Sequence, residues 1–430
     1  MGTGLAQASG FIGSEFFQPE IPKFIRVRQR LDGRHIADVE QDVFQKLLAA
    51  GLNSVVHPGS RIAITAGSRG MGQFRELLKG TVKAVRQFGG EPFLVPAMGS
   101  HGGATAAGQE ALLRCLGVIP EEIGADIRAT METARHGTSE SGAMAHFDAV
   151  ANEADGVIVL GRVKTHPENT EGIASGLLKM VTVGLGKQMG AREAHSHGLW
   201  ESVQAVPKLS LAGGKILFGI GVVENAFRRP VEIEVTPGNF DAFYDLDRRL
   251  LRKAKRHFAK VPFDSLDVLV VEEIGKNISG TGMDLNVIGT WRVKGGRKQP
   301  DFKRIVALSL TEGSMGNGLG IGLADFTTKR FVERYNAEAT LINMLTATEP
   351  DSRNTVEAVV PPALDSDRAA IQAALYSCLA EEPRICRIQN TACLENLWIS
   401  ESLRAEAEAK GLEVAETEEP INFDAAGNLL

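Results

Sequence analysis

The feature that most constrains the fold is an alternation of short apolar runs with amphipathic segments. The runs Arg61–Thr65 and Pro92–Pro96 are typical of buried strands, and Arg75–Phe88 between them has the apolar spacing of an amphipathic helix. Two strands joined by a helix form a βαβ unit, in which the strands are parallel. The apolar runs Gly156–Leu160 and Lys215–Ile220 are typical of parallel strands that are buried on both faces. The sequence therefore predicts an α/β fold with mostly parallel sheets.

The same pattern begins again after residue 255. A long helical stretch, Asp241–Phe258, precedes a new apolar strand, Asp267–Val271. The strand Ile305–Ser309 and helices near Asp367–Leu379 and Ser400–Lys410 complete a second α/β unit. Because 430 residues exceed what one core of this class usually contains, we expect two α/β domains with an active-site cleft between them.

Composition narrows the classes of function. The net charge is −6, so a basic footprint for nucleic acid is missing, and no segment is long and apolar enough to suggest a membrane partner. The N-terminal residues lack the pattern of a secretory signal, and the four cysteines form no CxxC pair. We therefore expect a cytoplasmic protein with reduced thiols and a small-molecule ligand. The sequence indicates no oligomeric state.

Unusual residues follow three of the predicted strands. In open parallel sheets, ligands bind beyond the carboxyl ends of the strands. The loops at these places are Ala66–Gly70, Ala97–Gly103 and Gly161–Pro167. Each loop contributes at least one charged or titratable group, and the candidates are Arg69, His101 and His166.

Each of these residues has a functional and an ordinary interpretation. Arg69 and Ser68 stand in a glycine-flanked turn whose backbone N–H groups suit an anion, although a surface arginine is the alternative. His101 is flanked by glycines, which argues against a packed core histidine but leaves a solvent-facing loop histidine open. His166 precedes Pro167, which favours an extended turn, and by itself it favours neither interpretation.

The most informative stretch is Glu171–Gly186, which is rich in small and apolar residues and holds one central lysine, Lys179. Burial would lower the pKa of such an amine and favour a nucleophile or a site of covalent attachment. The alternative is a lysine whose ammonium extends to water. Sixteen residues further on stand His195 and then His197, two imidazoles close enough in sequence to bind one metal.

The ordered set GSR, GSHGG, KTHP, SGLLK and a following histidine resembles the lactate racemase family. Members of that family use a nickel-pincer nucleotide, nickel pyridinium-3,5-bisthiocarboxylic acid mononucleotide. The resemblance is clearest from about residue 60 to residue 200 and is more diffuse beyond residue 260. Its specificity lies in the order of the motifs.

The resemblance implies a cofactor site. Lys179 would hold the cofactor through a thioamide, and His195 would complete the square-planar nickel, with His197 as the alternative ligand. Ser68 and Ser175 are assigned to cofactor binding with them.

The resemblance also implies a catalytic pair. His101 and His166 would act as alternating acid and base on the substrate hydroxyl, and Arg69 would contact the cofactor. It assigns residues 1–255 to a racemase-like cofactor-binding domain and residues 256–430 to a substrate-clamping domain.

Two departures from the family pattern concern the loops. Ala66–Gly70 lacks the aspartate and the proline that usually occupy the first loop, and His101 is followed by Gly102 in place of an arginine. These departures indicate a divergent member, a racemase or epimerase acting on a 2-hydroxy acid or a related sugar acid.

The chemistry of such a reaction is consistent with this set. A histidine takes the hydroxyl proton while the cofactor accepts a hydride, which avoids a carbanion next to a carboxylate. A clamp for the substrate carboxylate is expected in the second domain, where Lys276 and Asn277 follow a predicted strand. An ordinary loop lysine is the alternative for Lys276. The expected partners are the hydroxy acid and the enzymes that synthesise the cofactor.

Two other classes of function remain open. The first is a zinc- or manganese-dependent hydrolase or lyase with His195, His197 and either Glu193 or Glu201 as ligands, which leaves Lys179 without a role. The second is a non-catalytic module that holds a nucleotide in the glycine-rich loops.

Overall fold

The computed structural model describes residues 19–68, 71–165, 173, 175–293, 296–346 and 354–430. The chain forms two compact units. The N-terminal unit comprises Asp32–Phe258 with Glu338–Thr355, and the C-terminal unit comprises the first 31 residues, Ala259–Ala337 and Val356–Leu430. Within the described residues, no helix combines the length and apolar character needed to cross a membrane.

This division differs from the predicted domains at the N-terminus. The sequence placed residues 1–255 in one domain, whereas β1 (Phe24–Arg28) pairs with β14 (Asn396–Ile399) and β15 (Glu413–Glu419) in the sheet of the C-terminal unit. The chain passes between the units after Phe258, close to the predicted boundary. Periodicity identifies a strand but not its distant partner, so sequence alone did not place β1.

The sheet of the N-terminal unit has the strand order β3-β2-β6-β7-β8. Its first four strands are parallel, and β8 is antiparallel to β7. The strands are β2 (Arg61–Ala66), β3 (Glu91–Pro96), β6 (Gly156–Arg162), β7 (Ile216–Glu224) and β8 (Pro230–Pro237). This confirms the predicted α/β class with mostly parallel strands.

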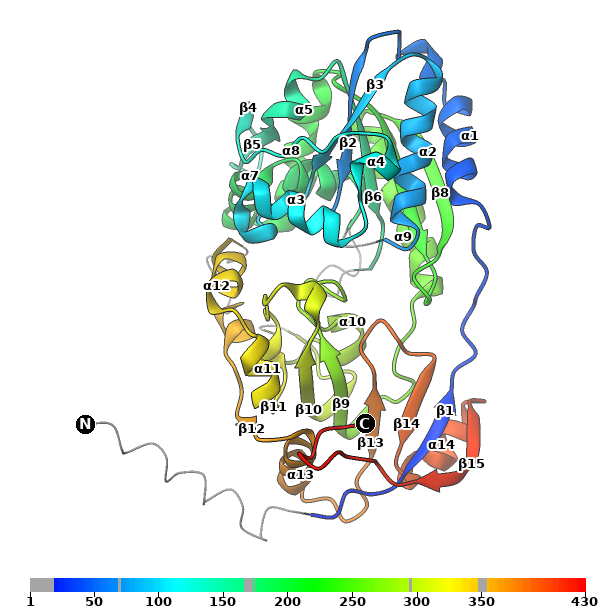
Figure 1. The fold of residues 1–430 in the computed structure, drawn as a ribbon, viewed down its shortest axis with the longest axis vertical. Coiled ribbons are helices and arrows are strands. Elements are labelled where there is room, and N and C mark those ends of the chain that lie inside the picture. The colour runs from blue at the N-terminus through cyan, green and yellow to red at the C-terminus, as the bar shows by residue number, and fades with distance from the viewer. Residues whose placement is uncertain (1–18, 69–70, 166–172, 174, 294–295, 347–353) are drawn as a thin grey trace, which may run out of the picture. The chain divides into compact units, whose positions relative to one another are not determined.

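Helices cover both faces of this sheet (Figure 1). Successive strand residues point to opposite faces: Ile62 and Ile64 join the core on one face, and Ala63 joins the core on the other. The first face is covered by α1 (Val39–Ala49), α2 (Phe74–Gln87), α3 (Ala106–Cys115) and α4 (Pro120–Ile123). The second is covered by α5 (Ala149–Glu153), α6 (Leu177–Lys179), α7 (Lys187–Ser196), α8 (Leu199–Ala212) and α9 (Phe240–His257). A hairpin of β4 (Thr133–Thr138) and β5 (Met144–Asp148) packs beside α7 and α8.

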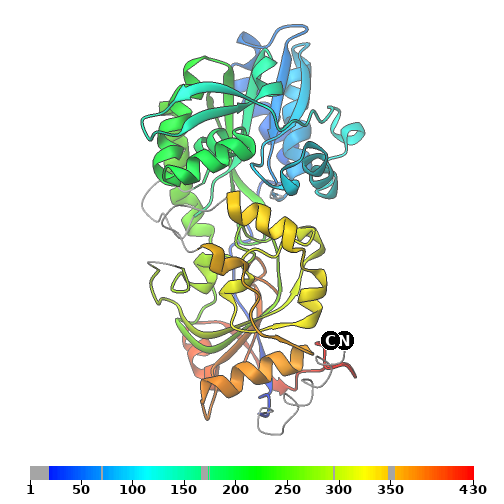
Figure 2. The same cartoon turned by 90° about the vertical axis from the view of Figure 1, so that its left-hand side faces the viewer.

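The C-terminal unit has a mixed sheet of strand order β10-β9-β13-β14-β1-β15. The strands β9 (Ser265–Ile274), β10 (Asp301–Leu310) and β13 (Ile385–Ile388) are parallel, and the remaining three strands are antiparallel to their neighbours. Helix α13 (Asp367–Cys378), coloured orange in Figure 2, packs on β9 and β10.

The remaining elements are short. Strands β11 (Thr327–Thr328) and β12 (Ala363–Leu364) pair in parallel. The other helices are α10 (Leu285–Ile288), α11 (Lys329–Arg334), α12 (Ala337–Thr346) and α14 (Arg404–Ala409). Turns of 3-10 helix span Leu52–Ser54, Gly102–Ala104, Glu312–Ser314, Ile321–Leu323, Asn354–Ala358 and Glu401–Leu403.

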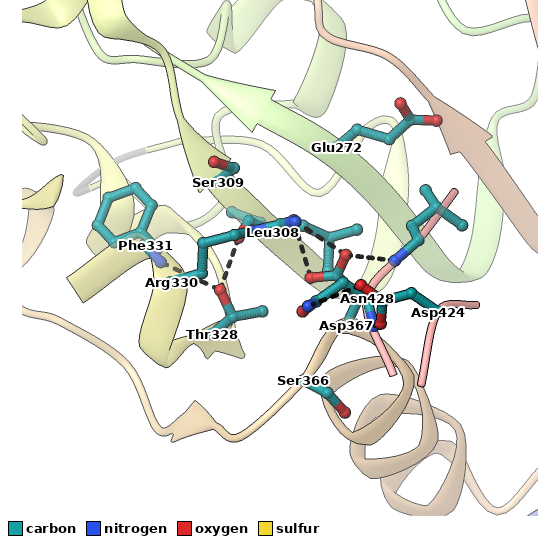
Figure 3. A network of polar contacts seen from close by, with 12 residues as sticks. Glu272, Leu308, Ser309, Thr328, Arg330, Phe331, Ser366, Asp367, Asp424 and Asn428 are labelled. Atoms are coloured by element: carbon teal, nitrogen blue, oxygen red, sulfur yellow. Dashed lines mark hydrogen bonds and ion pairs between the residues drawn. The ribbon is translucent and has the colours of Figure 1, made fainter. Parts of the chain in front are cut away.

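A buried carboxylate, Asp367, joins three parts of the C-terminal unit (Figure 3). It lies in the first turn of α13 and is fully buried. Its oxygens accept hydrogen bonds from Nη2 of Arg330 at 3.0 and 2.9 Å and from the backbone N–H of Leu429 at 2.8 Å. The C-terminal segment, with its turn at Gly427 and Asn428, is thereby attached to α11 and α13.

We predict that Asp367→Ala lowers the free energy of unfolding by about 3 kcal/mol, because the substitution removes the acceptor of Arg330 and of the Leu429 N–H. Urea denaturation followed by the fluorescence of Trp398, which lies on β14, measures the change. Asp365→Ala is the control, because its ion pair with Lys329 is exposed, and a change within about 1 kcal/mol is expected. Equal effects of the two substitutions would contradict the assigned role.

Candidate functional site

A pocket of about 150 Å³ lies at the carboxyl ends of β2, β3 and β6 in the N-terminal unit. The chain runs from β2 to β3 on one side of β2, and β6 lies on the other side, so the pocket is at the switch point of the sheet. Its polar and charged lining residues are Ser68, His101, Arg162, Lys164, Ser175 and Lys179, and its apolar walls include Met71, Met98, Met180 and Val183.

Four residues proposed from the sequence therefore share one pocket. Ser68 follows β2, His101 follows β3, and Ser175 and Lys179 come from the segment that follows β6. The strands are parallel, so their ends, and the loops that continue them, meet at one edge of the sheet.

The other proposed residues are distributed differently. Arg69 and His166 lie outside the described residues. His195 lies on α7, is partly exposed, and is not among the residues that line the pocket.

Lys276 and Asn277 belong to the C-terminal unit. They occupy an ordered loop after β9, in which the Thr311 hydroxyl donates to Oδ1 of Asn277 at 2.6 Å and the Lys276 N–H donates to Oγ of Ser314 at 2.9 Å. The Lys276 ammonium donates to the carbonyl of Gly280. A role in substrate binding stays a prediction.

The segment that carries Lys179 has an unusual backbone. Helix α6 (Leu177–Lys179) continues into a π-helical turn, Met180–Gly184. Such turns occur frequently at functional sites because they displace side chains from the regular helical positions. The Lys179 side chain is partly buried, and its ammonium lies 5.1 Å from the ring centroid of Trp200 on α8.

A buried carboxylate fixes the start of this segment. Asp247 on α9 is 1% exposed and accepts hydrogen bonds from the backbone N–H groups of Leu177 at 2.9 Å and Leu178 at 3.1 Å. Burial raises the pKa of Asp247 to about 7, although the two N–H donors act in the opposite direction. A Cβ at Gly176 would stand 2.2 to 2.7 Å from the Asp247 carboxylate, so the close approach requires glycine.

An ion pair joins two loops beside the pocket. Arg162, at the end of β6, donates from Nη1 to Oε2 of Glu224 at 2.8 Å. The second carboxylate oxygen of Glu224 accepts the backbone N–H of Gly72 at 2.5 Å, and Ser175 donates to the carbonyl of Arg162 at 3.0 Å. Arg162, Lys164 and Glu224 were not predicted from the sequence as residues of the site. The close spacing of the two cationic residues Arg162 and Lys164 at the end of β6 could have indicated them.

Sequence reasoning also missed a buried lysine. Lys187, the first residue of α7, and Asp148, the last residue of β5, are both fully buried, with 2.8 Å between Nζ and Oδ2. Burial lowers the pKa of the Lys187 amine, and the Asp148 carboxylate opposes that shift. The pair lies in an apolar core, and the apolar periodicity of the surrounding sequence does not indicate a buried ion pair.

The residues of the zinc alternative have other contacts. The ring Nδ1 of His197 lies 3.0 Å from the carbonyl oxygen of Glu193, and the Glu193 carboxylate accepts the backbone N–H of Met144 at 3.0 Å. Within the described part of the chain, no group of three or more histidine, cysteine, aspartate or glutamate side chains has an arrangement that could hold a metal ion.

The sequence and structure comparisons include a distant structural neighbour. No family model matches the chain, and no curated protein matches its sequence. Among solved structures, the lactate racemase apoprotein from Thermoanaerobacterium thermosaccharolyticum is 11% identical, with a TM-score of 0.49. The match covers 86% of this chain and 99% of that one.

The pKa of Asp247 predicts a dependence of stability on pH. Since its folded-state pKa, about 7, exceeds the ordinary value of 3.8, the folded protein binds this proton more tightly than the unfolded chain does. The stability that the protein gains from this tighter proton binding is therefore fully present below pH 4. It is lost as the pH rises through 7, and the total loss in the free energy of unfolding is up to about 4 kcal/mol.

Urea denaturation of the wild type and of Asp247→Asn between pH 4 and pH 8 measures this contribution. The free energy of unfolding of the wild type minus that of the variant should fall up to pH 7 and then stay constant. A difference that grows with pH would show instead that the ionised carboxylate is the better partner for the two N–H groups.

Proposed function

We propose that this chain is an isomerase, a racemase or epimerase that inverts the carbinol centre of a 2-hydroxy acid or related sugar acid. The reaction would use proton-coupled hydride transfer with a nickel-pincer nucleotide tethered to Lys179. The observation that carries the proposal is that Lys179 and His101, an amine and an imidazole from separate loops, line the same pocket at the switch point. The order of the sequence motifs supports the same assignment.

The residues of the pocket fit the nucleotide part of this cofactor. Lys179 supplies the amine for the tether, and the hydroxyls of Ser68 and Ser175 line the pocket with it. Arg162 and Lys164 add positive charge that suits a phosphate. When bound, the cofactor would supply a carbon that accepts and returns a hydride. His195 is proposed as the nickel ligand.

The chain's own chemistry in this proposal is proton transfer at the substrate hydroxyl. His101 would take the hydroxyl proton from one enantiomer, and His166 would donate a proton to the keto oxygen when the other enantiomer is formed. In the reverse direction the two histidines would exchange the roles of acid and base. The methionine and valine walls of the pocket reduce the access of water to the keto acid formed in between.

The carboxylate of the substrate needs a positive partner. Lys276 and Asn277 are proposed for this role because they lie on an ordered loop beyond the carboxyl end of β9. That position is where ligands of parallel sheets bind.

The tether predicts a covalent mass. Protein produced together with the enzymes that synthesise the pincer nucleotide should carry a nucleotide-sized mass increment and nickel, both of which Lys179→Ala should abolish. Intact-mass spectrometry after denaturation and metal analysis measure the two quantities. Lys164→Arg is the matched control, because Lys164 lines the same pocket and is not the proposed tether. It should keep the increment.

Other outcomes of that experiment identify the other functions. An unmodified mass with stoichiometric zinc would contradict the tether and favour the hydrolase or lyase. A nucleotide that is removed by denaturation, without turnover of any hydroxy acid, would favour the non-catalytic binding module.

The proton-transfer role predicts a separation between loading and turnover. His101→Gln should keep the mass increment and nickel but reduce the rate of racemisation by about 10²- to 10⁴-fold, the usual contribution of a general acid or base. Chiral chromatography of a panel of 2-hydroxy acids measures the rate. His57→Gln, an exposed histidine outside the pocket, is the control. Unchanged turnover of His101→Gln would eliminate His101 as the acid and base.

A further inference from the structure

The buried Lys187 ammonium has three oxygen neighbours. It donates hydrogen bonds to the carbonyl of Pro96 at 2.5 Å and to Oε1 of Gln109 at 3.3 Å, and it forms an ion pair with Oδ2 of Asp148 at 2.8 Å. These oxygens come from the end of β3, helix α3 and the end of β5. Lys187 itself has φ +54°, a left-handed conformation that a lysine adopts only when its surroundings hold it there.

Gln109 extends these contacts to the loop that carries His101. It is fully buried, and its Nε2 donates to the carbonyls of Gly99 at 2.8 Å and His101 at 3.2 Å. Every polar atom of the Gln109 side chain is therefore used, the oxygen by Lys187 and the nitrogen by the loop. The backbone of His101 is thus linked through one side chain to a buried charge.

The same lysine ends the segment that carries Lys179. Lys187 lies eight positions after Lys179, and the π-helical turn lies between them. The turn packs directly on the His101 loop: a Cβ at Gly99 would lie 3.4 Å from Val183, and one at Gly184 would lie 3.0 Å from the carbonyl of Ala97. Lys187 therefore contacts both parts of the pocket, at the place where glycines allow the two backbones to approach.

Stability alone is a weak reason for this arrangement. Removing two charges from water disfavours folding, and a well-packed apolar pair of similar volume is often as stable as a buried ion pair. A buried pair does impose one geometry, because any displacement leaves a charge without its partner. The contacts of Lys187 are best explained by the position that they impose on the loop.

We propose that Lys187 and Gln109 are positioning residues that fix the His101 loop relative to Lys179. Lys187 holds the start of the loop at Pro96 and holds Gln109, and Gln109 holds the loop itself at Gly99 and His101. The effect of these residues on turnover rests on the proposed function, in which His101 moves a proton. The positioning of His101 can be measured in protein that catalyses no reaction.

The test uses the full-length apoprotein, which needs neither cofactor nor substrate. Gln109→Leu removes the donor to both carbonyls, and the His101 imidazole signals in the NMR spectrum, assigned with His101→Gln, should shift and broaden. The exposed His57 serves as an internal reference. Glu110→Gln is the matched control, because Glu110 lies next to Gln109 on α3 but pairs outward with Arg114. It should leave the His101 signals unchanged.

A second variant covers the case in which Gln109→Leu does not fold. Lys187→Met combined with Asp148→Asn removes both charges and keeps an oxygen for the Ala151 N–H, which Asp148 now caps. It should perturb the same His101 signals. If either folded variant gives His101 signals identical to those of the wild type, the positioning role is wrong, whatever reaction the protein catalyses.

Turnover separates this proposal from the function on which it draws. In loaded enzyme, Gln109→Leu should reduce kcat by about 10- to 100-fold, the effect expected of a misplaced catalytic group, with KM and the cofactor mass little changed. If kcat is unchanged although the His101 signals are perturbed, the proposed effect of the His101 position on turnover is wrong. Perturbed signals in a protein whose wild type racemises no hydroxy acid would overturn the proposed function and leave the positioning intact.

Discussion

The pocket depends on a short glycine-rich segment that is held at both ends by buried ionisable side chains. At its start, Asp247 accepts the backbone N–H groups of Leu177 and Leu178, and at its end Lys187 is bound to Asp148. The first N–H groups of a helix have no partner within the helix, so a carboxylate there determines where the helix begins. Lys179 lies between these two fixed points. Its position is therefore determined by contacts in the core and not by the surface loops.

Small residues allow these charged groups to reach the backbone. A side chain at Gly176 would occupy the space of the Asp247 carboxylate, and one at Gly102 would come within 2.5 Å of the backbone of Gly108. The latter contact gives a physical reason for glycine after His101. Gly102 also has φ +66°, a conformation that favours glycine. Glycine at this position is therefore explained by how closely α3 approaches the loop.

Local patterns predicted much of the fold and part of the site. The apolar runs correctly located β2, β3, β6, β7, β9 and β10, because strands buried on both faces of a parallel sheet are continuously apolar. The common edge of parallel strands grouped His101 with Arg69 and His166, and the family resemblance added Lys179, which lines the same pocket as His101. Sequence alone did not reveal the contacts of Asp247, 70 residues from Leu177, or of Lys187, 91 residues from Pro96. Such contacts exist only after folding, and a buried charge in an amphipathic helix resembles an exposed one.

The division between residues that line the pocket and residues that hold them has a chemical consequence. Ser68 and His101 stand on loops beyond the strand ends, where a change of side chain alters the pocket without disturbing the sheet. Gln109, Lys187 and Asp247 lie in the core, where a change alters the geometry of whatever chemistry the loops contain. A change of side chain in the first loop can therefore leave an amine and an imidazole in one pocket. The loops supply the side chains that line the pocket, and the buried polar groups determine the relative placement of the amine and the imidazole.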